Sequence, residues 1–396
     1  MLAPEPFFEP RGTPFSEYHR IKALGELGHR VDLVTYPFGA DVELPNLRII
    51  RSARPPLMRG VPIGPSMAKV ILDVGLTVTA LRQARRAAYD AIHSHEEMGL
   101  LGVWLAKRMG IPHLYDMHSS LPQQLTNFRY TGSRLMRRLF ESVERKMLDD
   151  SAVVITICQQ LQDTAIEMGA AERAILIENV MGGDVEDGVP APPEQVRAER
   201  GIRADQPLVL YTGTFESYQG LELLTLAAAR LQASHPEVAV LVVGGEPAQV
   251  EAARVRAARE GARLLFTGRR PAQEIPSFVR ACDILVSPRI AGTNTPLKIY
   301  SYLRSGKPIV ATDLVTHTQV LDRSCAALAP PEPAAFAAAI ARLLEDPVEV
   351  ARLVEAAQRL AATRYSREVY LARTRDACER LARHGAPARP ADTARA

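Results

Sequence analysis

Short apolar runs alternate with longer amphipathic stretches along most of the chain. The runs are rich in β-branched and aliphatic residues, as in buried strands, and the stretches between them carry apolar residues at helical spacing. This alternation predicts parallel sheets covered by helices. The opening residues, MLAPEPFF, resemble the end of a buried strand, and we expect the natural chain to start a few residues earlier. The first half predicts strands at Arg30–Tyr36, Leu47–Arg51, Ala91–Ser94, His113–Asp116, Ala152–Thr156 and Ala174–Ile177, and helices such as Ser16–Leu27 and Gly132–Asp149.

The second half repeats the alternation after an interruption. Gly182–Gln206 is rich in Gly, Pro and charge and lacks a sustained apolar period, which is typical of a linker. The strands predicted after it are Leu208–Thr212, Val238–Val243, Arg263–Thr267, Ile284–Ser287 and Pro308–Thr312. The pattern predicts an N-terminal domain over residues 1–181, a linker over 182–206, a C-terminal domain over 207–365, a helix over 366–384 that packs back on the N-terminal domain, and a disordered tail over 385–396.

Composition narrows the class of protein. With 396 residues the chain can bury two domain cores, and a formal charge of +3 with interspersed signs does not favour a nucleic-acid binder with one dominant positive field. The most apolar early stretch, Ala68–Leu81, contains Lys69 and Asp73 and is shorter than a membrane-spanning helix. No signal peptide is visible, so we expect a cytoplasmic protein. The four cysteines are far apart, without metal-ligand spacing, and are expected to be reduced and mostly buried: Cys158, Cys282, Cys325 and Cys378.

The most informative loop follows the strand Ile284–Ser287. Its sequence, SPRIAGTNTPLKIYSYLRSG, offers Thr295 as a helix N-cap, Pro296 at the first helical position followed by Leu297, and Gly306 as the stop. Lys298 in the first turn and Arg289 across the loop provide positive charge for a diphosphate. An ordinary capped helix with a solvated lysine would give the same pattern, so spacing alone leaves both interpretations open.

Several segments resemble the large retaining family four of glycosyltransferases. TPLKIYSYLRSGKPIVAT is similar to the family's donor-site helix, and VLYTGTFESYQGLELLTLAAARL to the opening of its C-terminal domain. LVVGGEP and LLFTGRRPAQEIPSFVRACDILVSP match the segments between them. Looser matches in the first half are RGTPFSEYHRIKALGELGHRVDLVT, AIHSHEEMGLLGVWLAKRMGIPHLYDMHSS, SAVVITICQQLQDTAIEMGA and ILIENV. The resemblance covers about residues 4–370, in order, and implies the GT-B fold: two Rossmann-like doubly wound domains facing each other across a cleft.

The resemblance also implies donor contacts, and several of them are altered here. The family's paired glutamates, of which the second holds the donor ribose, fall at Thr293 and Ser301. Two cations that would meet the diphosphate fall at Thr214, after Gly213, and at Gln219. A hydroxyl lacks the charge that makes a carboxylate the stronger acceptor. These departures put the ribose and diphosphate contacts in doubt.

Other groups would then have to supply the missing positive charge. Lys298 and Arg289 are the first candidates, with Arg269 or Arg270 after Gly268 as a further source. In the N-terminal domain the family has a glycine-rich loop after the first strand, and the segment from Pro10 to Pro14 lies at that place. Gly12 would let the backbone approach the donor phosphates, with Thr13 beside it. A lone glycine in a proline-rich turn is more often a turn residue only.

His118 is the candidate catalytic residue. In the family a histidine at this place contacts the transferred sugar near the reacting centre. A histidine at a strand end is otherwise more often structural. His93 and His95 end the preceding strand, and the alternative polar contacts are Glu96, Glu97 and Asp116.

The resemblance implies catalysis without a bound metal, without an organic cofactor and without an enzymic nucleophile. Transfer needs a stabilised diphosphate leaving group, and the donor phosphate takes the acceptor's proton. No DxD pair lies in a plausible donor loop. The expected substrates are a UDP- or GDP-sugar that donates a hexose-type sugar with retention, and an acceptor that the sequence does not identify.

The acceptor side offers one further feature. Ser133–Leu148 predicts an amphipathic helix with a basic face that would suit anionic lipid, as in relatives with lipid-linked acceptors. Peripheral contact with the inner membrane surface is one interpretation, and a solvated charged face is the other. The basic residues are Arg134, Arg137, Arg138, Arg145 and Lys146.

Two other functions stay open. A nucleotide-sugar epimerase or a phosphorylase on the same fold would need a catalytic carboxylate or a pyridoxal lysine, and neither has a clear candidate. A non-catalytic nucleotide-sugar binding or scaffold protein is supported by the substituted motif positions. The loop TNTPLKIYSYLRSGKP remains suited to a phosphate, which favours a variant active site.

Overall fold

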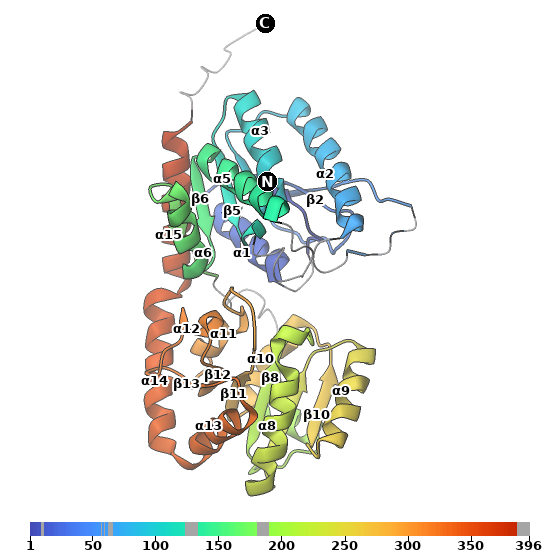
Figure 1. Ribbon diagram of the computed structural model, residues 1–396, viewed down its shortest axis with the longest axis vertical. Coiled ribbons are helices and arrows are strands. Elements are labelled where there is room, and N and C mark those ends of the chain that lie inside the picture. The colour runs from blue at the N-terminus through green and yellow to red at the C-terminus, as the bar shows by residue number, and fades with distance from the viewer. Residues whose placement is uncertain are drawn as a thin grey trace, which may run out of the picture. The chain divides into compact units, whose positions relative to one another are not determined.

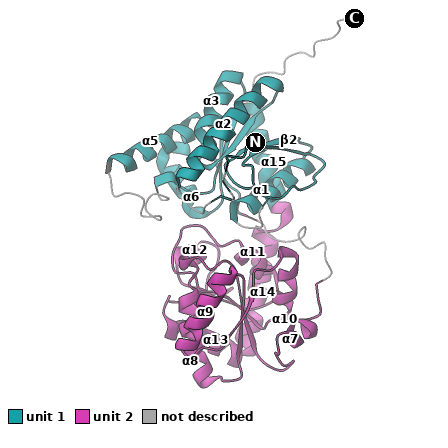
Figure 2. Cartoon of the chain, turned by 90° about the vertical axis from the view of Figure 1, so that its right-hand side faces the viewer, with its two compact units in different colours: residues 1–178, 370–396 teal, residues 179–369 magenta. Residues whose placement is uncertain are grey.

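A computed structural model shows two compact units (Figure 2). It describes residues 1–8, 12–56, 58, 60–61, 66–122, 134–179 and 190–385. Unit 1 comprises Met1–Glu178 together with the chain from Tyr370 onward, and unit 2 comprises Asn179–Val369. The last helix, α15 (Arg367–Arg383), therefore joins the first unit for most of its length. Most of the predicted tail, from residue 386, lies outside the described residues.

Unit 1 is built on a parallel sheet of seven strands in the order β3-β2-β1-β4-β5-β6-β7. The chain starts in the middle of this sheet, runs outward to β3, and returns beside β1 to build the other half. The carboxyl ends of β1 and β4 thus meet at a topological switch point, where ligands bind in open α/β sheets. The strands are β1 (Leu2–Ala3), β2 (Val31–Thr35), β3 (Leu47–Arg51), β4 (Ile92–His95), β5 (His113–Met117), β6 (Val153–Thr156) and β7 (Ala174–Leu176).

Helices cover both faces of this sheet (Figure 1). Right-handed crossovers place the helix that follows β1 on one face and the helices after β3, β4 and β5 on the other. In agreement, α2 contacts α3 and α3 contacts α5, whereas α1 is linked to α15 by the Arg20–Thr374 hydrogen bond. The helices are α1 (Gly12–Glu26), α2 (Met67–Arg86), α3 (Gly99–Met109), α5 (Arg134–Asp150) and α6 (Gln159–Ala165), besides α15.

Unit 2 has a parallel sheet of six strands in the order β10-β9-β8-β11-β12-β13. Its switch point lies between β8 and β11, so the loops that follow these two strands share one edge of the sheet. The strands are β8 (Leu208–Thr212), β9 (Ala239–Val243), β10 (Leu264–Gly268), β11 (Ile284–Ser287), β12 (Ile309–Thr312) and β13 (Ala327–Ala329).

The helices of unit 2 bury both faces of its sheet, and α8 and α13 pack side by side on one of them (Figure 1). Successive residues of β8 point into opposite cores: Leu208 and Leu210 into one, Val209 and Tyr211 into the other. A strand buried on both sides reads as a continuous apolar run, as the sequence pattern indicates. The helices are α7 (Pro193–Ala198), α8 (Leu221–Ser234), α9 (Pro247–Arg259), α10 (Ile275–Ala281), α11 (Lys298–Arg304), α12 (Val315–Thr318), α13 (Pro333–Glu345) and α14 (Pro347–Arg364).

Local signals explain where several helices begin and end. The Ser66 hydroxyl accepts from the Lys69 N–H at the start of α2, and the Asp346 carboxylate accepts from two backbone amides at the start of α14. Helix α3 ends at Gly110, which adopts a left-handed conformation with φ 68°. Among the described residues no helix is both long and apolar enough to cross a membrane. Three of the four free cysteines are buried, and Cys378 is partly exposed.

The predicted strands are confirmed to within one residue at most ends, but three expectations are corrected. The short strand β13 was not predicted, because its three small residues give no β-branched run. Helix α1 begins at Gly12 and not at Ser16, so Gly12 lies at the start of a helix instead of in a loop. Of the helix predicted over Gly132–Asp149, residues 132 and 133 lie outside the described residues, and α5 continues to Asp150.

Candidate functional site

The side chain of Lys298 lies at the carboxyl end of β8. Its Nζ donates a hydrogen bond of 3.0 Å to the backbone carbonyl of Thr212 and lies 4.0 Å from the centre of the Tyr211 ring. The lysine is the first residue of α11, so the loop after β11 brings it to the neighbouring strand. Burial, and to a lesser extent the nearby Arg289, lower the pKa of Lys298 to about 7.

Arg289 lies in the same loop and is also partly buried. Its Nε donates to the Ala291 carbonyl at 2.8 Å, its Nη1 donates to the Asn294 carbonyl at 3.1 Å, and its guanidinium stacks 4.9 Å from the centre of the Tyr218 ring. Burial lowers the pKa of Arg289 despite the nearby tyrosines. The loop thus folds around this side chain.

Neither cation has a carboxylate partner among the described residues. Every hydrogen bond found for Lys298 and Arg289 in this part of the chain ends on a backbone carbonyl, and each cation raises the cost of charging the other. Two adjacent, partly buried positive charges without an anion are unfavourable. Such a pair becomes favourable when a doubly charged anion binds between or beside them.

A glycine permits this loop geometry. Gly292 has a φ of 111°, and a Cβ added there would lie 2.3 Å from Arg289 Nη2. An L side chain at this position would therefore be strained and would also displace the guanidinium. The sequence pattern does not single out Gly292, but its close approach to Arg289 makes it part of the site.

The residues that precede Lys298 are arranged differently from the prediction. Helix α11 begins at Lys298 with Leu297 before it, so Thr295 is not the N-cap and Pro296 is not the first helical residue. The α11 segment has only seven residues because Pro296 and Leu297 form a preceding turn, in which Pro296 accepts from the Ile299 N–H. Thr295 Oγ1 is buried and has no hydrogen-bond partner among the described residues. Gly306, with φ 72°, follows the end of the helix.

The hydroxyl groups at the two positions that replace the motif glutamates already donate hydrogen bonds within the protein. Ser301 Oγ donates to the Lys298 carbonyl at 2.9 Å, within its own helix. Thr293 Oγ1 lies 3.4 Å from the Asn294 side-chain oxygen, a long hydrogen bond. Each hydroxyl keeps a lone pair but no proton for a ligand acceptor.

Only some of the other residues predicted for the donor site lie near Lys298. Gly213 and Thr214 follow β8, and the Thr214 carbonyl accepts from the Tyr211 hydroxyl at 2.8 Å, which joins this loop to the ring beneath Lys298. Gly268 ends β10, and Arg269 after it pairs with Glu246 at 3.2 Å on the surface. The structure thus brings Gly213 and Thr214 to Lys298 but gives Arg269 a different partner.

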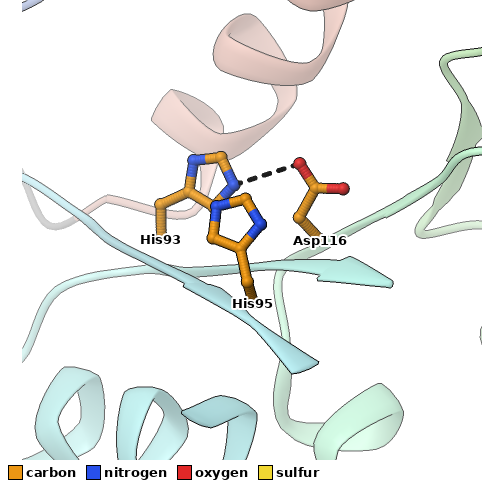
Figure 3. Close-up of side chains that lie close together, drawn as sticks. All are labelled: His93, His95 and Asp116. Atoms are coloured by element: carbon orange, nitrogen blue, oxygen red, sulfur yellow. Dashed lines mark hydrogen bonds and ion pairs between the residues drawn. The ribbon is translucent and has the colours of Figure 1, made fainter. Parts of the chain in front are cut away.

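In unit 1 a buried polar network lies at the carboxyl ends of β4 and β5. His118 Nε2 lies 3.1 Å from His95 Nδ1 and 3.3 Å from Asp116 Oδ1. Asp116 Oδ2 lies 3.3 Å from His93 Nε2 (Figure 3) and accepts from Arg20 Nε at 3.2 Å. The structure therefore joins the candidate His118 to both histidines of the preceding strand.

The charges in this network alternate. Burial favours the neutral form of Asp116, but Arg20 and His118 outweigh burial and hold the pKa of Asp116 well below its usual range. Burial disfavours charged His118, yet the Asp116 carboxylate raises the pKa of His118 above its ordinary value. Burial and then the charge of His93 lower the pKa of His95 well below its usual range. An ionised Asp116 thus stands between Arg20 and His118, and it favours the charged form of His118.

Three of these groups are near enough to share a cation. His93, His95 and Asp116 each offer one ligand atom, and these atoms lie within 4.8 Å of one another, the only such grouping in the part of the chain that the structure describes. The stacked rings of His93 and His95 come from alternate residues of β4 (Figure 3). The Arg20 guanidinium already neutralises Asp116, and a second cation beside it would be repelled. The geometry therefore fits a hydrogen-bond network better than a metal centre.

The predicted phosphate loop of unit 1 is described only in part. Pro10 and Arg11 lie outside the described residues. Gly12 has φ 42° and a Cβ added there would meet nothing within 4 Å. Thr13 follows in the first turn of α1. The backbone at Gly12 is thus open to a ligand, but no contact identifies one.

Sequence reasoning missed Tyr211, Tyr218 and Arg20. Tyr211 and Arg20 belong to an ordinary strand and helix, and Tyr218 belongs to the turn between β8 and α8. The role of each depends on a contact with a residue at least 70 positions away. It also missed two buried glutamates, Glu5 and Glu17, of which Glu17 lies beside His95. The sequence offered one signal for Glu17, namely a charged residue at a helical position that faces the core.

Comparisons with known proteins match both units. A family model described as "Glycosyl transferase 4-like domain" matches residues 18–179, and one described as "Glycosyl transferases group 1" matches residues 206–346. The chain is 29% identical over 158 residues to a D-inositol 3-phosphate glycosyltransferase of Mycobacteroides abscessus, a match that covers 40% of this chain and only 34% of the relative.

Other relatives match over more of their length. Identity is 22% over 333 residues to a phosphatidyl-myo-inositol mannosyltransferase of Propionibacterium freudenreichii, covering 81% of this chain and 78% of the relative. The crystal structure of Anabaena HepE in complex with UDP-glucose superposes with a TM-score of 0.73 at 19% identity, covering 96% of this chain and 99% of that one. This last likeness shows the fold, which is the predicted GT-B architecture of two parallel α/β units.

Proposed function

The chain belongs to the group 1 glycosyltransferases, and on that premise we propose that it transfers a hexose-type sugar from a nucleotide-diphosphate sugar to an acceptor, with retention of the anomeric configuration. The observation that carries the proposal is the pair Lys298 and Arg289 at the switch point of the second sheet. Neither has a carboxylate partner among the described residues. A diphosphate supplies the negative charge that this pair lacks.

The same pair suits the chemistry of transfer. Breaking the bond from the sugar to the diphosphate leaves negative charge on the leaving group while positive charge grows at the anomeric carbon. The Lys298 ammonium and the Arg289 guanidinium would stabilise the leaving diphosphate, and the unsatisfied Thr295 hydroxyl would donate to a donor oxygen. His118 would contact the transferred sugar. No residue is assigned as a nucleophile, and we propose that neither a metal nor an organic cofactor takes part.

The substituted motif positions change the expected affinity more than the expected chemistry. Ser301 and Thr293 replace carboxylates that would accept from donor hydroxyls, and both hydroxyls here donate elsewhere. A charged hydrogen bond contributes about 1.5–3 kcal/mol, so the loss of one weakens binding roughly ten- to hundredfold. A non-catalytic nucleotide-sugar binding protein is the second candidate, because weaker ribose contacts and two absent phosphate cations favour it.

The names of relatives support a choice of donor. One structural neighbour was solved with UDP-glucose, and a relative matched over most of its length is named a mannosyltransferase. We therefore propose a UDP- or GDP-hexose. The same relative is named for a phosphatidyl-inositol substrate, which supports a lipid-linked acceptor over a soluble saccharide or small molecule.

The surface of unit 1 supports a lipid-linked acceptor. Helix α2 exposes Met67, Val70, Ile71 and Val74, and Trp104 of α3 is half exposed. We call these five residues the apolar face. The C-terminal turns of α2, α3 and α5 expose basic side chains. Exposed apolar residues and exposed basic residues on one unit are the combination that binds an anionic bilayer. The basic residues are Arg82, Arg85, Arg86, Lys107, Arg108, Arg145 and Lys146.

A panel of nucleotide-sugars tests the proposal. The purified protein is heated with each common UDP-, GDP- and ADP-sugar, and nucleotide release is followed with and without acceptors that include polyprenyl and inositol lipids. Thermal stabilisation by one nucleotide-sugar, together with acceptor-dependent release of its nucleotide, is the expected result. Stabilisation without release under any acceptor would favour the binding protein, and no stabilisation by any nucleotide would contradict the donor site.

A further inference from the structure

Two glutamates of unit 1 are buried side by side, and among the described residues neither carboxyl group pairs with a lysine or an arginine. Glu5 follows β1 and is 9% exposed, and Glu17 in α1 is 0% exposed. Their carboxyl groups lie within hydrogen-bonding reach of each other. Among the described residues no donor satisfies either carboxyl oxygen of Glu17. Two carboxylates cannot both be charged at this distance in a buried site, so the pair retains a proton.

The pair adjoins the histidine network through one contact. Glu17 Oε1 lies 3.5 Å from His95 Nδ1, the same nitrogen that lies 3.1 Å from His118 Nε2. His95 is fully buried, and its other nitrogen, Nε2, has no hydrogen-bond partner among the described residues. The protonation of His95 is therefore decided at Nδ1, between Glu17 on one side and His118 on the other.

The proton on the carboxyl pair determines which partner donates. When Glu17 is neutral, no negative charge draws a proton onto His95 Nδ1, so this nitrogen keeps its lone pair and accepts from His118 Nε2–H. When Glu17 is ionised, a proton on His95 Nδ1 is stabilised by the carboxylate, so this nitrogen no longer accepts from His118 Nε2–H. Protons on both facing nitrogens, 3.1 Å apart, would repel each other, so the protonated form of His118 would be disfavoured.

We propose that Glu5 and Glu17 form a positioning unit that keeps one proton and, through His95, fixes His118 in the protonated form that meets the sugar. The proposal rests on the proposed function only for the role of His118, because the proton arrangement itself requires no substrate. Neither glutamate touches the reacting atoms, and both act through His95.

The remaining charges around the unit agree with this arrangement. Burial and the neighbouring Glu5 raise the pKa of Glu17 well above its ordinary value, and burial raises the pKa of Glu5. Burial also raises the pKa of Glu96, beside His118, to about 7. The charged and titratable groups that face the unit or His95 are Arg20 from α1, Lys69 from α2, His93 from β4, Glu96 and Glu97 from the turn after β4, Asp116 from β5, His118 after β5 and the amino group of Met1.

The direct test is nitrogen NMR of the full chain labelled with ¹⁵N-histidine, which distinguishes the tautomers of each ring. We expect His95 to be neutral with an unprotonated Nδ1 at neutral pH, and His118 to remain charged to a higher pH than a free imidazole. Observation of His95 with a proton on Nδ1 would overturn the proposal in the unmodified protein, whether or not any variant folds. A shift of the His93 and His95 nitrogen signals to metal-bound values on addition of Zn²⁺ alone at stoichiometric concentration would assign the cluster to a metal and also overturn the proposal.

Substitutions at Glu17 provide a second test, because a change in packing alone would not alter the His95 tautomer or the pH profile. Glu17→Gln keeps a neutral donor and should preserve the His95 tautomer and, at pH 7, kcat within about twofold, while removing the alkaline limb that the pair contributes. Glu17→Leu should give mixed His95 tautomers and lower kcat about tenfold or more with an unchanged donor KM. Glu26→Gln, an exposed carboxylate at the end of the same helix, is the control. If Glu17→Leu leaves the tautomers unchanged while the protein transfers sugar, the positioning unit fails and the proposed function stands. If His95 and His118 show the predicted tautomers but the protein turns over no donor, the positioning unit stands and the proposed function fails.

Discussion

Lys298 Nζ donates to the backbone carbonyl of Thr212 at 3.0 Å, so a side chain from α11 is fixed at the end of a neighbouring strand. The contact ties the loop after β11 to the loop after β8, the two loops of the switch point in unit 2. A carbonyl oxygen orients the ammonium but does not neutralise it. The site is thus preorganised for an anion.

Replacing Lys298 by Met should separate binding from folding. The Lys298→Met variant should lose about 1.5–3 kcal/mol of nucleotide binding, a roughly ten- to hundredfold weaker Kd, because a charged hydrogen bond to the diphosphate is removed. Its thermal stability at pH 7 should equal or exceed that of the parent chain, since a partly buried charge is also removed. Calorimetric titration and thermal unfolding check the two effects, and a destabilised variant with unchanged Kd would contradict the assignment.

Nucleotide binding should depend on pH through Lys298. Its pKa is lowered to about 7 in the folded protein, whereas an unfolded chain charges it up to about pH 10.4. The folded state therefore binds fewer protons between these values, so this group makes stability rise with pH from about 7 to about 10. A bound diphosphate favours the charged form, so affinity should fall above pH 7. Calorimetry at pH 8 in two buffers of different ionisation enthalpy should show proton uptake that Lys298→Met abolishes.

The loop glycine offers a test of Arg289. Gly292→Ala places a methyl group against the guanidinium at a φ of 111°, so we expect Arg289 to move and nucleotide affinity to fall about three- to tenfold. Gly261→Ala is the matched control, because Gly261 also has a positive φ, of 70°, but a Cβ there would meet nothing within 4 Å. Equal affinities for the two variants would remove Arg289 from the donor site.

The apolar face should be required for binding to lipid vesicles and not for binding of the donor in solution. Val74→Glu introduces a charge at a residue that is 60% exposed, and should abolish sedimentation with vesicles that contain anionic phospholipid. Val255→Glu, at a 53% exposed position of α9 in unit 2, should sediment as the parent chain does. Failure of the parent chain itself to sediment would end the membrane proposal and leave the donor site unaffected.

Much of the fold follows from the sequence because both sheets are buried on two sides. Continuous apolar runs such as Leu208–Thr212 and Ile284–Ser287 can be neither solvent-exposed strands nor amphipathic helices, and the structure has them with these bounds. The start of α1 could not be predicted, because Gly12 and Pro14 read as turn residues although the helix includes both. Strand β13 lacks the residues that mark a strand and depends on its pairing with β12.

The candidate site, like the fold, could be predicted from the sequence only in part. Lys298 and Arg289 lie in one loop, so their spacing reveals them. Thr295 was predicted as a helix cap from local preference, but the preceding turn places the helix start at Lys298 and leaves the hydroxyl unsatisfied. The contact of Glu17 with His95 joins positions 78 residues apart, and only the folded chain brings them together.

The most direct measurement follows both products of transfer in one reaction. The protein is incubated with the nucleotide-sugar that stabilises it and with acceptor lipid in anionic vesicles, and the lipid is examined by mass spectrometry while the free nucleotide is quantified. We expect an acceptor heavier by one sugar residue and the free nucleoside diphosphate to appear in equal amounts, and both to fall strongly in Lys298→Met. Tight nucleotide-sugar binding without either product, over every acceptor class tested, would contradict the proposed transfer.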